Sequence, residues 1–125
     1  MNFKKKNNNS YLTHWIIQKV TALALIPLLC WFLYIMKSFV NKDYKNKIFW
    51  LQESPNSFLL ALFMILAIYH SQIGLSNVIE DYVQNKKSKT ILLMVKAIFC
   101  LLLGVFTIIV IFALSVGFNV YEKSV

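Results

Sequence analysis

The chain has 125 residues, of which 58% are hydrophobic and only 14% are charged, and its formal net charge is +8. This composition excludes an ordinary soluble domain. The basic excess does not indicate nucleic-acid binding either, because all 13 basic residues are lysines and no arginine is present to contact a base edge at two points. Three long apolar stretches account for the imbalance, and the short segments between them leave no room for a separate soluble active site.

The apolar stretches cover residues 16–39, 58–79 and 91–118. About 20 helical residues span a bilayer core of about 30 Å, and backbone groups in hydrocarbon must be paired within a helix. The sequence therefore predicts an all-α membrane protein, with a single membrane domain over residues 1–125. The three predicted transmembrane helices are about 15–40, 57–83 and 89–118.

The first predicted helix opens on a polar segment that contains His14, Gln18, Lys19 and Thr21. Together these side chains could hold an anion such as a carboxylate through charge and hydrogen bonds. The alternative is a set of topology signals with a helix cap. Pro27 lies inside this helix and removes one backbone hydrogen bond, so we expect a kink there.

The lysines flank the apolar stretches and predict the orientation of the chain. Eight belong to the N-terminal side and the second loop, against five in the first loop and the C-terminal tail. The N-terminus is therefore expected in the cytoplasm, and the first loop outside, where residues 48–51 would lie along the membrane surface. Lys19 and Lys96 lie near helix ends, where a long stem can carry the ammonium to the lipid headgroups.

The second predicted helix carries the most informative pattern, which starts at His70. A helix turns about 100° per residue, so Gly74, Asn77 and Asp81 lie within about 40° of His70 on one face. An imidazole inside a membrane span is costly unless something compensates it, so it marks a site. A neutral imidazole is a strong ligand for haem iron; the alternative is a histidine hydrogen-bonded to another helix without any metal.

Tyr82 lies 12 residues after His70, about 18 Å farther along the helix axis, at the predicted cytoplasmic end. Its hydroxyl can donate a hydrogen bond to a carbonyl such as that of a quinone, and Asp81 can orient this donor or relay protons. An interfacial tyrosine with ordinary helix-end charges is the alternative. The third predicted helix is almost wholly apolar, and Gly104 permits close packing there.

Two segments together resemble a known family. The first helix begins His14-Trp-x-x-Gln-Lys-Val-Thr21-Ala22, and the second contains His70-x-x-x-Gly74 with Asp-Tyr eleven and twelve residues after the histidine. These segments resemble the small hydrophobic membrane-anchor subunits of succinate dehydrogenase, respiratory complex II. The resemblance covers most of the first two helices, whereas the third agrees only in length and hydrophobicity.

The resemblance implies a complex in the bacterial cytoplasmic (inner) membrane, where this non-catalytic chain anchors a flavoprotein and an iron–sulfur subunit and packs with a second, cytochrome b anchor subunit. It implies that His70 is one axial ligand of a shared haem b and that Tyr82 and Asp81 contact ubiquinone. It also implies that His14 and Lys19 lie near the haem propionates. Lys19 stands where the family usually has arginine, and lysine lacks the planar two-point geometry of a guanidinium.

Two other functions stay open from the sequence. One is the anchor of a related fumarate reductase, although the Asp-Tyr pair at 81–82 is of the ubiquinone type and favours the dehydrogenase. The other is a small membrane assembly or transport protein in which His70 relays protons.

Overall fold

The computed structural model describes residues 8–116, which form four helices: α1 (Asn8–Val40), α2 (Tyr44–Gln52), α3 (Ser54–Tyr82) and α4 (Lys86–Val116). Three of them, α1, α3 and α4, have the length and hydropathy of membrane-spanning segments. The predicted all-α class with three such helices is thereby confirmed. All three long helices begin earlier than predicted, and residues 117–118 of the predicted third helix lie outside the described residues.

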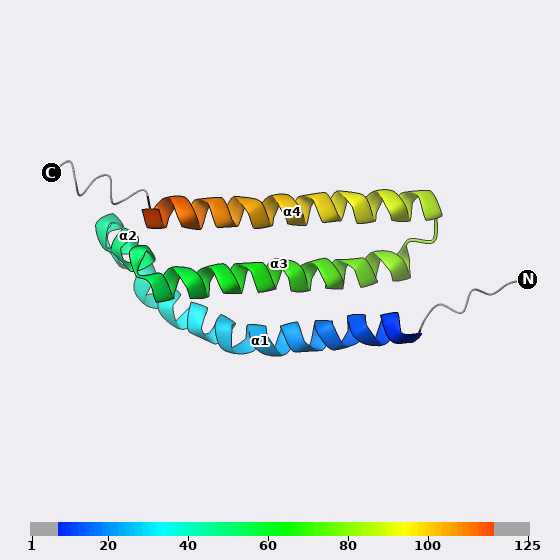
Figure 1. Ribbon diagram of the computed structural model, residues 1–125, viewed down its shortest axis with the longest axis horizontal. Coiled ribbons are helices and arrows are strands. Elements are labelled where there is room, and N and C mark those ends of the chain that lie inside the picture. Colours follow the sequence, from blue (N-terminus) through cyan, green and yellow to red (C-terminus); the bar gives the residue numbers. More distant parts are fainter. Residues whose placement is uncertain (1–7, 117–125) are drawn as a thin grey trace, which may run out of the picture.

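The three long helices lie side by side, with α3 between α1 and α4 (Figure 1). Helix α1 continues through Pro27 without a break and curves in its second half toward the end where α2 lies (Figure 1). The expected effect of the proline is therefore a bend and not an interruption. This arrangement leaves both flat sides of the helix layer without a covering helix from the described part of the chain.

Few side chains are buried inside this layer. The most buried ones among the described residues are Ile48, at 4% exposed, and Thr21, Ile73 and Cys100, each at 7%. Large apolar side chains elsewhere stay exposed along all three long helices. So extensive an apolar surface suits lipid or the helices of another membrane subunit.

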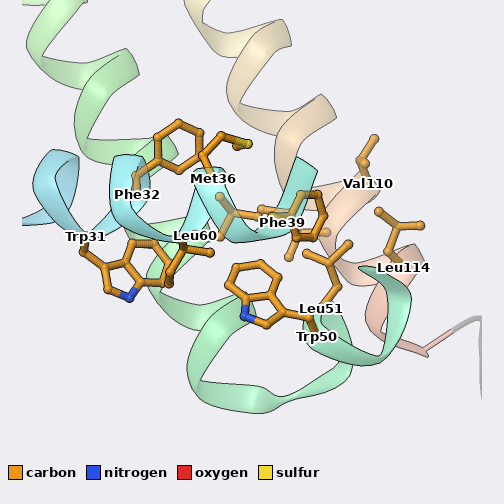
Figure 2. Close-up of a pocket in the computed structure, with 11 residues that line it drawn as sticks. Trp31, Phe32, Met36, Phe39, Trp50, Leu51, Leu60, Val110 and Leu114 are labelled. Atoms are coloured by element: carbon orange, nitrogen blue, oxygen red, sulfur yellow. The ribbon is translucent and has the colours of Figure 1, made fainter. Parts of the chain in front are cut away.

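Helix α2 lies near one end of the layer and was not expected as a helix; the sequence indicated only a segment on the outer membrane surface. Its Trp50 ring stacks on Trp31 of α1, with centroids 6.3 Å apart, and meets the Phe39 ring edge-on at 5.3 Å. Figure 2 shows these rings around an apolar cavity of about 170 Å³. Nine residues are too few for an independent helix in water, so these contacts and the burial of Ile48 hold α2 in place.

A sharp turn joins α2 to α3 with only Glu53 between them. The last carbonyls of α2 lack partners in their own helix, and the first turn of α3 supplies them. Asn56 Nδ2 donates to the Trp50 carbonyl at 3.1 Å and to Glu53 Oε2 at 2.7 Å, while the Ser57 hydroxyl donates to the Leu51 carbonyl. The turn is thus closed by side chains, which fixes α2 against the start of α3.

Replacing Ile48 with alanine is expected to destabilise this end of the bundle by about 2 kcal/mol or more, because the substitution leaves a cavity under α2. The measurement is the temperature at which the detergent-solubilised protein stops eluting as a single species. Tyr44→Ala on the same helix is the control, since the Tyr44 side chain is largely exposed. Equal shifts for the two variants would show that α2 is not held by the burial of Ile48.

Candidate functional site

His70 lies on the seam between α1 and α3, where a hydroxyl from α1 meets its ring. Thr21 Oγ1 lies 2.9 Å from His70 Nδ1, a contact between residues 49 positions apart in sequence. The same hydroxyl is 2.9 Å from the Ile17 carbonyl and 3.1 Å from the Gln18 carbonyl of its own helix. His70 is therefore partly buried and compensated by a polar partner, as a histidine in a membrane-spanning helix requires.

This hydrogen bond is compatible with both interpretations of His70 from the sequence. A histidine without metal needs a partner on another helix, and Thr21 is one. A metal-binding histidine also needs a partner at its second ring nitrogen, which fixes the ring orientation. Within residues 8–116, Nε2 has no hydrogen bond, so one ring nitrogen stays available.

The face of α3 next to His70 has free space. A Cβ atom added at Gly74, one turn after His70, would meet no atom within 4 Å. The helical rotation had placed Gly74 on the same face as His70. The described part of the chain thus leaves room on this face for a group that it does not itself supply.

A second polar contact fixes the register between α1 and α3. Asn77 Nδ2 donates to Gln18 Oε1 at 3.0 Å. Since the helices run antiparallel, this pairing places His14, one turn before Gln18, at the same end of the layer as Asp81, one turn after Asn77. The polar stripe on α3 is therefore turned toward α1, and both His14 and Asp81 have exposed side chains.

Lys19 is not brought to the His70 seam. It comes two residues before Thr21, a rotation of about 200° around α1, so it projects to the other side of that helix. Its Nζ lies 5.8 Å from the centroid of the Trp15 ring, in a cation–π contact. Of the four polar residues at the start of α1, Gln18 and Thr21 thus contact α3, and Lys19 contacts its own helix.

Two lysines of α4 donate hydrogen bonds to the C-terminal half of α3. The sequence did not predict these contacts. Lys96 Nζ donates to the Gln72 carbonyl at 3.1 Å and to the Ser76 hydroxyl, and Lys89 Nζ donates to the Glu80 carbonyl at 2.8 Å. Lys96 was expected to reach toward the headgroups, but its ammonium binds α3 instead. No local pattern could predict this, because the acceptors lie on a different helix.

Tyr82 and Asp81 end α3 at the start of the short connection to α4. The Tyr82 side chain is 83% exposed, and Asp81 is also exposed. In the described part of the chain, neither the phenol nor the carboxylate has a hydrogen-bond or ion-pair partner. Both groups are therefore free to bind a molecule or subunit at this end of the layer.

Comparison with known proteins identifies the family. The sequence model of one protein family, the succinate dehydrogenase/fumarate reductase transmembrane subunit, matches residues 4–111 of this chain. Over 100 residues, 79% of both chains, this chain is 35% identical to the succinate dehydrogenase hydrophobic membrane anchor subunit of Rickettsia typhi and 34% identical to that of Rickettsia prowazekii.

A more distant relative is the succinate dehydrogenase membrane anchor subunit of Reclinomonas americana. It is 25% identical over 85 residues, which cover 62% of this chain and 68% of the relative. No solved structure matches the chain. The match over residues 4–111 and the identity to the rickettsial subunits show that the chain belongs to the family of succinate dehydrogenase/fumarate reductase transmembrane subunits.

Proposed function

We propose that this membrane-anchor subunit contributes one haem ligand, His70, and part of a ubiquinone site, Tyr82 with Asp81, to a succinate:ubiquinone oxidoreductase. Its role as a non-catalytic, multi-pass anchor that associates with the other subunits of such a complex follows from its family and its three spanning helices. The family model also includes fumarate reductases, but the relatives described above are named as succinate dehydrogenase subunits.

The observation that carries the haem proposal is the environment of His70. Its Nδ1 is hydrogen-bonded to Thr21, and the other nitrogen is unoccupied within the described residues. An imidazole that binds a metal through one nitrogen also needs such a partner at the other, so this environment supports the ligand role. Glycine at position 74 adds no side chain on this face, and a Cβ placed there would meet open space, which supports the proposal of a bound ring system beside His70. His70 would hold the haem b iron, a group that supplies one-electron transfer when bound.

The second axial ligand would come from the partner cytochrome b anchor subunit. His14 is the other histidine of the chain, but it precedes Thr21 by seven residues, about 10 Å along α1. It is therefore too far along the helix to face the same iron as His70. An open helix layer with little buried surface offers the face on which a second anchor subunit can pack.

The quinone proposal depends on the exposed end of α3. A tyrosine hydroxyl without a partner can donate to a quinone carbonyl, and the adjacent carboxylate of Asp81 can orient that donor or pass on a proton. With the N-terminus in the cytoplasm, Tyr82 lies at the cytoplasmic side of a bacterial inner membrane. The flavoprotein and iron–sulfur subunits would bind there, next to a cytoplasmic substrate.

A propionate role for His14 and Lys19 stays a prediction. His14 lies at the end of the layer where Asp81 lies, within reach of a charged group at the membrane surface. Lys19 would have to leave the Trp15 ring to face the His70 seam. The geometry therefore favours a different role for Lys19: its positive charge helps to set the orientation of the chain in the membrane, and its ammonium makes a cation–π contact with Trp15.

The experiment that tests the proposal is purification of the tagged chain from its own membranes. We expect a flavoprotein, an iron–sulfur protein and a second anchor to co-purify, and we expect a low-spin b-type signal in the reduced-minus-oxidised spectrum. A complex without this signal would remove the haem role and leave the anchor role. Purification without the dehydrogenase subunits would favour the assembly or transport protein with a proton-relay histidine.

Gly74→Leu is expected to lower the haem content of the complex several-fold, because leucine would fill the space beside His70. The fold itself should tolerate leucine, which meets open space in this chain and is a better helix former than glycine. Haem per complex is measured by pyridine haemochrome against flavin. Gly104→Leu on α4, where a Cβ also meets open space, is the matched control. A full haem content in Gly74→Leu would show that the haem does not bind against the face of α3 that carries Gly74.

A further inference from the structure

We propose that Thr21 is a positioning residue: its hydroxyl selects the tautomer of His70 that carries the proton on Nδ1, so that the lone pair of Nε2 points away from α1 as a metal ligand. This proposal rests on the proposed role of His70 as an axial haem ligand. It assigns a partner function to a residue of α1 that the sequence placed in a group interpreted either as an anion site or as topology signals with a helix cap.

The assignment follows from counting protons at the Thr21 hydroxyl. A hydroxyl has one proton to donate and two lone pairs that accept. Two carbonyl oxygens, of Ile17 and Gln18, lie within 3.1 Å and can only accept, so they take the hydroxyl proton. The lone pairs of Thr21 Oγ1 are then left to face His70 Nδ1 at 2.9 Å. We therefore assign Nδ1 as the donor of that hydrogen bond.

A neutral imidazole carries one N–H, so a proton on Nδ1 leaves Nε2 as the nitrogen with a lone pair. Donation from Nδ1 to an oxygen also makes Nε2 a stronger electron donor and fixes the plane of the ring. Thr21 is only 7% exposed, so water competes little for this hydrogen bond. The hydroxyl thus prepares both the direction and the donor strength of the ligand nitrogen.

The position of the hydroxyl is itself fixed by contacts on either side. Its bonds to the carbonyls of α1 restrict the Thr21 rotamer. Two turns farther along α3 from His70, the bond between Asn77 and Gln18 holds α1 and α3 in register at 3.0 Å. The distance between Thr21 and His70 is therefore set by the helix packing and not by a flexible side chain.

The test compares Thr21→Val, which keeps the shape and removes the hydroxyl, with Thr21→Ser, which keeps the hydroxyl, in the purified complex. Thr21→Val is expected to weaken haem retention about 10- to 100-fold. It should also shift the haem midpoint potential to a more positive value, because a weaker donor stabilises the ferric state less. Thr21→Ser should restore both values. Thr21→Ala repeats the loss of the hydroxyl with a smaller side chain.

Thr90→Val is the matched control, because the Thr90 hydroxyl also donates to a carbonyl of its own helix, that of Lys86 at 3.0 Å, without contacting His70. The haem content is given as the ratio of haem to flavin, so a lower yield of the complex does not count as a loss of haem. His70→Leu is measured in the same series. If it removes the signal while Thr21→Val and Thr21→Ala retain the wild-type haem content and potential, the positioning role is wrong and the ligand proposal stands. If His70→Leu keeps the signal, both proposals fail.

Discussion

Replacing His70 with leucine is expected to remove the low-spin b-type signal from the complex while the chain stays in the membrane. Leucine cannot bind iron, and it inserts into a bilayer more favourably than a polar residue. Thr21 loses one partner but keeps the Ile17 and Gln18 carbonyls, so no buried hydroxyl is left unpaired. The measurement is the reduced-minus-oxidised spectrum of membranes that contain equal amounts of the complex.

His14→Leu is the control for this experiment, because it removes the other histidine of the chain. The His14 side chain is exposed and lies about two turns from Thr21, so the low-spin spectrum should persist. An unchanged spectrum in His70→Leu would exclude His70 as an axial ligand. If only His14→Leu loses the signal, the axial ligand would be His14 at the start of α1 and not His70.

Tyr82→Phe is expected to lower succinate:ubiquinone reductase activity about tenfold, which corresponds to the loss of one hydrogen bond of about 1.5 kcal/mol in the reacting complex. Electron transfer from succinate to an artificial acceptor should stay nearly intact, because that reaction does not need the quinone site. The structure of the chain should not change, since the 83% exposed phenol has no partner among the described residues. Both activities are measured on the same membranes.

Tyr34→Phe provides a matched control at the opposite end of the layer. Tyr34 is 81% exposed and lies in the second half of α1, so it loses the same hydroxyl far from the proposed site. Equal losses of the quinone and artificial-acceptor activities in Tyr82→Phe would indicate damaged assembly and not a quinone role. Equal losses of quinone activity in Tyr82→Phe and Tyr34→Phe would likewise remove the specific role of Tyr82.

Part of the fold could be read from local sequence. The three apolar stretches determined the number of spanning helices, because a helix that crosses a bilayer needs a minimum apolar length. The end of α3 at Tyr82 agrees with the expected end near residue 83. The placement of His70, Gly74 and Asn77 on one face of that helix also needed only the fixed rotation per residue.

Helix α2 shows where local patterns fail. Of its nine residues, only 48–51 were singled out by the sequence, and they were expected to lie along the membrane surface. A helix this short is not stable by its own propensity. It forms because Ile48 is buried and Trp50 packs against Trp31 and Phe39, three contacts that depend on the neighbouring helices.

By itself, the sequence determined the three long helices, the polar stripe on α3 and the positions of His70 and Tyr82 along it. Only the tertiary structure decided which groups meet: that Thr21 contacts His70, that Lys96 turns to α3, and that Lys19 stays over Trp15. The physical reason is that a helical period is set by neighbours three and four residues apart. The Thr21–His70 contact joins residues 49 positions apart, and it depends on the register and rotation of two packed helices, which no local period contains.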